Sequence, residues 1–223
     1  MNARPALPWL FALFLAGCGG GPPPADWKLN AVSLLDHAQQ RWLEGDTPAA
    51  ELALGQVRQE IAKSGRTDLL ARAELAACAA RVASLDFAPC TAYDKLAPDA
   101  APADRAYARF LAGDWQDLDG KWLAVHYAGL VGAKEIPAAN QTARDIKDPL
   151  PRLLAIALLF KAGRSDPASL AMAVDTASER GWRRPLLAWL EVGRQRALAA
   201  GDTAAAEHFQ RRRAFVLQST KTP

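Results

Sequence analysis

The residue types that most often carry catalysis and metal binding are scarce in this chain. It has 3 histidines, 3 cysteines, 2 methionines and 3 tyrosines among 223 residues. His37, His126 and His208 lie far apart, and none belongs to a His-Glu-x-x-His metal pair. No serine stands in a Gly-x-Ser-x-Gly turn, and no glycine-rich phosphate loop follows a candidate strand. The sequence therefore predicts no metal, no cofactor and no enzymatic activity.

A large excess of charge of one sign is also missing. The formal net charge is only +3 at pH 7, although the sequence pI is about 8.9. Domains that bind nucleic acid concentrate lysine and arginine on one face or along one helix. The small excess here predicts a mildly basic surface and no nucleic-acid partner.

The apolar run near the start of the chain is too short to cross a membrane. Leu7 to Leu15 is apolar, whereas a membrane-spanning helix needs about 20 such residues. Arg4 precedes the run, and the run ends in the motif Leu15-Ala16-Gly17-Cys18. This order resembles the lipobox of bacterial lipoproteins; the alternative is an ordinary secretory signal peptide with an incidental cysteine. The resemblance implies that residues 1–17 are a signal peptide and that Cys18 becomes the lipidated first residue.

A glycine- and proline-rich segment follows the lipobox. Residues 18–26 contain three glycines and three prolines in succession, which predicts a lipidated tether with a flexible part and a stiff part. The residue after Cys18 is Gly19 and not aspartate. By resemblance to lipoprotein sorting, we expect anchoring by lipid to the periplasmic face of the outer membrane, in preference to the inner membrane.

Beyond the tether, residues 27–217 are numerous enough for one domain with a real core, and residues 218–223 are predicted to be a flexible tail. No segment shows convincing period-two alternation, whereas apolar residues recur at helical spacing. The sequence therefore predicts an all-α fold. Residues 86–103 and 129–151, which are rich in proline, are predicted to be irregular. Helices are predicted over 27–42, 48–61, 69–80, 103–112, 115–126, 150–162, 167–180, 184–200 and 203–217.

A short motif occurs twice between predicted helices. Gly45-Asp46-Thr47-Pro48-Ala49-Ala50-Glu51 is repeated as Gly201-Asp202-Thr203-Ala204-Ala205-Ala206-Glu207. With Ala38 before the first copy, and Gly193 and Ala197 before the second, each resembles a unit of a tetratricopeptide-repeat protein. The resemblance implies antiparallel helical hairpins stacked as a repeat array. The units lack the family's proline, their spacing is irregular, and any alanine-rich hairpin with a glycine turn is the alternative.

Two cysteines remain after Cys18. Cys78 and Cys90 would lie in an oxidising compartment, twelve positions apart. No histidine lies near enough in sequence to suggest a zinc site. We therefore expect a disulfide, in preference to two free thiols or a metal site.

A cluster of tryptophan and arginine is the best candidate for contact with a partner. Arg180, Trp182, Arg183 and Arg184 fall at a predicted hairpin turn, and these two residue types dominate interface hot spots. The alternative is a solvated turn with one anchoring aromatic residue. Farther on, the run Arg211–Arg213 complements the dipole of the last helix or contacts anionic envelope material.

A second cluster combines carboxylates with tryptophans. Asp114, Asp117 and Asp119 lie beside Trp115 and Trp122, which is a combination seen in sugar sites. Aspartate is also the expected capping residue at turns and helix starts. The sequence thus favours an envelope scaffold that binds one or more envelope proteins and the membrane, with no small-molecule cofactor. A peptidoglycan-binding or cell-wall-modifying protein and a mainly structural spacer are the alternatives.

Overall fold

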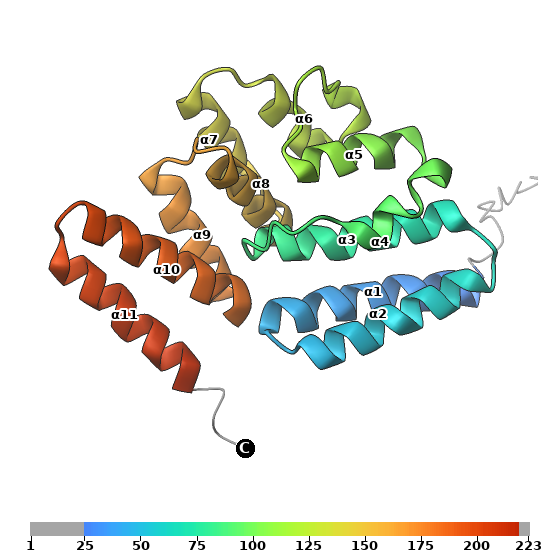
Figure 1. Ribbon diagram of the computed structural model, residues 1–223, viewed down its shortest axis with the longest axis horizontal. Coiled ribbons are helices and arrows are strands. Elements are labelled where there is room, and N and C mark those ends of the chain that lie inside the picture. The colour runs from blue at the N-terminus through green and yellow to red at the C-terminus, as the bar shows by residue number, and fades with distance from the viewer. Residues whose placement is uncertain (1–24, 219–223) are drawn as a thin grey trace, which may run out of the picture.

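The computed structural model describes residues 25–218 (Figure 1). Every regular element in that range is helical, which confirms the all-α prediction. The expected signal peptide, Cys18, nearly all of the tether, and residues 219–223 lie outside the described residues. The α-helices are α1 (Asp26–Glu44), α2 (Thr47–Ala62), α3 (Thr67–Ala83), α4 (Thr91–Asp94), α5 (Pro102–Ala112), α6 (Val125–Gly132), α7 (Ile136–Asp145), α8 (Pro149–Lys161), α9 (Pro167–Glu179), α10 (Arg183–Ala199) and α11 (Thr203–Gln218).

The two copies of the Gly-Asp motif form the same kind of turn. Gly45 and Gly201 end α1 and α10 with φ of 91° and 72°, a left-handed conformation that glycine adopts without steric cost. The next residue starts the following helix in each copy. Asp46 accepts a hydrogen bond from the backbone N–H of Ala49, and Asp202 accepts one from Ala205. The repeat therefore encodes two helical hairpins, α1–α2 and α10–α11.

Small residues let both hairpins pack closely. Ala38 and Ala50 are buried in the α1–α2 hairpin, and Ala197 and Ala206 are buried in the α10–α11 hairpin. The alanine side chain is a single methyl group, so the two helix backbones can approach each other closely and still leave no gap.

Helix α8 is the centre of the main core. It contacts α3, α7 and α9, and each side chain from Leu153 to Leu159 is buried. A helix that is apolar on every side is stable in water only when other helices cover all of it. A smaller cluster around Val57 and Ile61 lies under α1, α2 and the start of α3.

The remaining helices extend this core in two directions. On one side, α3 packs against the α1–α2 hairpin. On the other side, α9, α10 and α11 follow α8, and each packs against the helix before it. Helix α10 also contacts α1, so segments from the two ends of the described chain lie side by side (Figure 1).

The prediction of a helix over residues 115–126 was wrong. Asp117 has φ of 52°, and a 3₁₀ turn at Gly120–Trp122 precedes the start of α6. In this turn, Asp119 accepts a hydrogen bond from the backbone N–H of Lys121, two residues ahead. Local bonding of this kind competes with helix formation.

Part of the region predicted to be irregular is helical instead. Helix α7 lies inside residues 129–151, which the prolines predict to be irregular. Pro137 falls in the first turn of α7, where a missing backbone N–H costs nothing. Residues 86–101 hold only the short helix α4 and a 3₁₀ turn at Ala97–Asp99, and α5 begins at Pro102.

Cys78 of α3 and Cys90 lie at disulfide-bonding distance, with Cα atoms 5.9 Å apart. The bond fastens the segment that leads into α4 against α3, as expected from the sequence.

Removing this disulfide is expected to destabilise the protein. Cross-linking residues twelve positions apart stabilises the fold by about 3 kcal/mol in the chain-entropy model. At roughly 2–4 °C per kcal/mol for a chain of this size, Cys90→Ser should lower Tm by about 6–12 °C. Thermal unfolding followed by circular dichroism measures the change, and Cys78→Ser/Cys90→Ser should match the single variant. An unchanged Tm in both variants would show that the bond contributes nothing.

Candidate functional site

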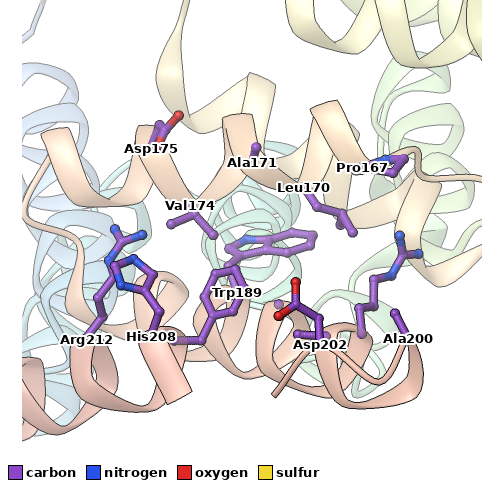
Figure 2. A pocket seen from close by; sticks show the side chains of 14 residues that line it. Pro167, Leu170, Ala171, Val174, Asp175, Trp189, Ala200, Asp202, His208 and Arg212 are labelled. Carbon is purple, nitrogen blue, oxygen red and sulfur yellow. The ribbon is translucent and has the colours of Figure 1, made fainter. Parts of the chain in front are cut away.

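A hollow of about 440 Å³ lies between α9, α10 and α11. It is open to solvent, and its size falls in the range of ligand-binding clefts. Figure 2 shows the indole of Trp189 between side chains of α9 and the α10–α11 hairpin. The elements that form the hollow come from neighbouring parts of the sequence, because α9, α10 and α11 are consecutive antiparallel helices.

The floor of the hollow is apolar. Trp189 from α10 is only 1% exposed, and Leu170 and Val174 from α9 are also buried. Trp189 is held on its other side by Phe160, whose ring meets it edge-on at 5.5 Å between centroids. Phe209 from α11 completes the floor and is half-buried. This surface suits an apolar side chain, since covering it removes further apolar area from water.

One glycine permits α11 to form the wall of the hollow. A Cβ atom added at Gly193 of α10 would lie 2.7 Å from two ring carbons of Phe209. Phe209 therefore packs directly on the α10 backbone, which is a contact that a larger residue would prevent.

Glu191 of α10 also holds α11 in place, through an ion pair between the two helices. Its carboxylate accepts hydrogen bonds from Arg194 and Gln195 on α10 and forms an ion pair at 2.8 Å with Arg213 of α11. The hydrogen bond from Arg194 is the main reason that the pKa of Glu191 falls to about 2. Because the pKa of Glu191 is lowered, its ionised carboxylate stabilises the folded state at pH values above the ordinary glutamate pKa near 4.3. This stabilisation is lost as the pH falls toward 2.

The rim of the hollow carries two guanidinium groups without carboxylate partners. Arg211 and Arg213 of α11 pair with Glu207 and Glu191, but Arg196 and Arg212 have no ion pair among residues 25–218. The rim carboxylates are Asp175 of α9 and Asp202, which already caps α11. His208 lies beside Arg212 on the same rim (Figure 2).

The hollow therefore combines an apolar floor with a rim that carries two carboxylates and two arginines without ion pairs among the described residues. Of the two carboxylates, that of Asp202 is already committed to capping α11.

Substituting Gly193 tests how closely α11 must pack. Gly193→Ala should destabilise the protein by about 1–3 kcal/mol, because the added methyl group overlaps the ring of Phe209. Urea unfolding measures the change. Gly55→Ala is the matched control, since Gly55 is also helical and has open space at its Cβ position; it should be neutral or stabilising by up to about 1 kcal/mol. Equal effects of both variants would contradict close packing at Gly193.

The tryptophan–arginine cluster singled out in the sequence joins two helices of the chain itself. The indole N–H of Trp182 donates to Gln40 Oε1 at 3.1 Å. Arg183 and Arg184 donate to the backbone carbonyls of Glu44 and Trp42, at 2.8 and 2.7 Å. The two carbonyls lie in the last turn of α1, where no following helical N–H reaches them at the usual i+4 spacing and where cations are favoured; the Trp42 carbonyl also accepts the N–H of Gly45.

Aromatic contacts strengthen the same joint. The guanidinium carbon of Arg184 lies 3.9 Å from the ring centroid of Trp42, and burial lowers the pKa of Arg184. Trp182 is itself only 4% exposed, and Arg180 is exposed, 5.5 Å from the ring of Trp182. These contacts give Trp182, Arg183 and Arg184 an intramolecular role that the sequence prediction did not include.

The joint should contribute measurably to stability. Arg184→Ala removes a charged hydrogen bond to a carbonyl and the stacking on Trp42, which together predict a loss of about 2–3 kcal/mol. Urea unfolding measures the loss, and Arg180→Ala, which removes an exposed arginine of the same cluster, should change stability by less than about 0.5 kcal/mol. If both variants unfold at the same urea concentration as the parent protein, the joint does not stabilise the fold.

The second sequence candidate does not form a convergent acidic site. Asp114 and Asp119 are exposed and pair with Arg109 and Lys121. The hydrogen bond from the basic partner lowers the pKa of each carboxylate, whereas a glycosidase acid requires a raised pKa. Asp117 is exposed as well, and none of the three lines the hollow.

The two tryptophans of this candidate lie in different surroundings. Trp115 is partly buried, stacks on Phe110 at 5.4 Å, and donates to the Phe110 carbonyl at 3.0 Å. Trp122 is 45% exposed, with the Lys121 ammonium 5.7 Å from its ring centroid. Only Trp122 is thus available to a ligand, which is too little to bind a sugar chain by stacking on both sides.

The described residues offer no metal centre. Within residues 25–218, no three or more His, Cys, Asp or Glu side chains gather closely enough to hold a metal ion. His37, His126 and His208 lie on α1, α6 and α11, respectively. In the same range, no helix has both the length and the apolar character needed to cross a bilayer.

No known protein family, curated protein or solved structure matches this chain. The hollow between α9 and α11 was not predicted as a unit. The sequence indicated Arg212 only as part of a basic run. A sequence signal for the hollow does exist. Along α10 and α11, apolar residues are followed by arginines about one helical turn later.

Proposed function

We propose that the protein is a lipid-anchored, periplasm-facing lipoprotein of the bacterial cell envelope that acts as a protein-binding scaffold. The observation that carries this proposal is the hollow between α9, α10 and α11, which has an apolar floor and two arginines without ion-pair partners on its rim. The lipobox at Leu15-Ala16-Gly17-Cys18 supports anchoring through Cys18, with the outer membrane as the proposed location.

The architecture suits such a role. We further propose that the hairpins belong to a tetratricopeptide-like arrangement, which is supported by the two Gly-Asp turns with the same capping bond. Consecutive antiparallel helices stacked in this way leave grooves along the array that hold an extended or helical segment of another protein. In this proposal, the hollow between α9, α10 and α11 is such a groove, formed by the last three helices of the described chain.

The chemistry of the hollow defines its partner. A bulky apolar side chain of the partner fills the space above Trp189 and Phe209, as anchor residues do in helix-in-groove recognition. An acidic residue near that anchor pairs with Arg196 or Arg212. The partner is therefore an amphipathic segment of another envelope protein, with acidic residues flanking an apolar anchor.

Photocrosslinking in cells tests the scaffold function. A photoreactive amino acid at Ala171, an exposed residue that lines the hollow, should capture one or two envelope proteins in stoichiometric yield. The same amino acid at Ala138, an exposed residue of α7 outside the hollow, is the matched control. Capture should be specific to position 171, and mass spectrometry of the crosslinked peptide should find acidic residues beside the contact.

Other outcomes would overturn the proposal. Recovery of the same abundant neighbours from positions 171 and 138 would support a spacer. Recovery of glycan fragments would support a cell-wall role. In parallel, the mass of the N-terminal peptide shows whether Cys18 carries lipid, and Cys18→Ala shows which crosslinks require the anchor.

Charge reversal on the rim tests the proposed partner chemistry. With the partner identified by crosslinking, Arg196→Glu/Arg212→Glu should weaken binding at least about tenfold, because attraction to an acidic flank becomes repulsion. Titration calorimetry of the purified proteins measures Kd. Arg211→Glu is the control, since Arg211 is exposed and is not part of the lining of the hollow. An equal loss in both variants would exclude a specific contact with the hollow.

A further inference from the structure

A second apolar surface lies at the end of the domain where the described chain begins. Leu29 and Val32 of α1 are 54% and 56% exposed and lie one helical turn apart. Val32 also borders a hollow of about 190 Å³ between α1, α2 and α3, together with Trp27, Leu35 and Leu69. We call these five residues the tip patch.

The tip patch lies close to the lipidation site in the sequence. Cys18 precedes Asp26, the first residue of α1, by eight positions, which span at most about 28 Å when fully extended. Trp27, Leu29 and Val32 follow within the first two turns of α1. When lipid on Cys18 is inserted in a bilayer, the start of α1 therefore stays within about 28 Å of the membrane surface.

From this juxtaposition we infer that the tip patch rests in the interface of the bilayer that holds the Cys18 lipid. The inference depends on the lipid anchor of the proposed function. Tryptophan and aliphatic side chains partition into the membrane interface, where an indole ring sits at headgroup depth. Moving the exposed side chains of Leu29 and Val32 from water into an apolar phase is favourable. The bilayer that holds the Cys18 lipid is the apolar phase that the tether keeps within reach.

The charges around the patch determine the kind of contact. Arg72 borders the small hollow but pairs with Asp104 at 3.0 Å. At the α2–α3 turn, Lys63 and Arg66 pair with Glu60 and Asp68. Lys28, which also borders the hollow, is a single exposed ammonium group. The contact is therefore made by apolar insertion and does not require anionic lipid.

This contact orients the candidate site. The start of α1 and the α10–α11 hairpin lie at opposite sides of the molecule (Figure 1). With the tip patch in the membrane, the hollow between α9 and α11 faces away from the bilayer and remains open to a partner in the periplasm.

Spin labelling of the lipidated protein in vesicles tests this inference. A nitroxide is placed at Val32→Cys in the full mature protein, purified with its lipid and reconstituted in phosphatidylcholine vesicles. Cys78 and Cys90 are paired, so the introduced thiol is the one that reacts. Leu52→Cys is the matched control, since Leu52 is an aliphatic residue of α2 that is 68% exposed and lies outside the patch.

The expected result is a label at position 32 that collides with oxygen more than with a water-soluble nickel complex. The label at position 52 should show the opposite preference. Adding Leu29→Asp to the Val32→Cys protein should abolish the oxygen preference of the label at position 32. Replacing one quarter of the lipid with phosphatidylglycerol should leave the result unchanged.

Equal accessibility of positions 32 and 52 to the nickel complex would overturn the inference. Immersion that occurs only with phosphatidylglycerol would also overturn it, because the contact would then be electrostatic. Flotation of the vesicles and the mass of the N-terminal peptide report the lipid anchor separately. A protein that floats while its patch stays aqueous thus refutes the tip contact and leaves the proposed function standing.

Discussion

The relative placement of the helices depends on hydrogen bonds between the start of α10 and the end of α1. Carbonyl groups of the last turn of α1 have no N–H partner at the usual i+4 spacing, and Arg183 and Arg184 donate to those of Glu44 and Trp42. The residues joined are about 140 positions apart, so this contact fixes the α1–α2 hairpin relative to α9, α10 and α11. Without it, the two groups of helices would be connected only through α3 and α8.

Local rules in the sequence predicted most of the helices. Glycine turns, aspartate caps and helical spacing of apolar residues located α1, α2, α3, α5, α8, α9, α10 and α11 within a few positions. The failures have local causes too. Pro137 starts a helix instead of ending one, and the turn after Trp115 forms through Asp117 and Asp119 in place of a helix. The tetratricopeptide-like stacking stays a prediction, since hairpin motifs do not specify how hairpins are assembled.

The candidate site was harder to predict than the fold. Trp182 and Arg184 have the residue types of an interface, and they do form one, but their partner is α1 of the same chain. Composition cannot distinguish contact with another protein from contact with a distant segment. Likewise, the sequence alone does not distinguish the roles of the three consecutive arginines Arg211, Arg212 and Arg213. Only the positions of Glu207 and Glu191 show that Arg212, which borders the hollow, is the one left without an ion pair among the described residues.

The position of α11 at the end of the helix order has a consequence for the cooperativity of the fold. This helix packs mainly on α10, whereas α8 is covered on every side. Helices with few neighbours open at lower free energy than the global unfolding transition. The wall of the hollow that α11 forms is therefore expected to open at a lower free energy than the core around α8. A ligand seated over Trp189 would contact α9 and α11 together, and its affinity would include the free energy of holding α11 in place.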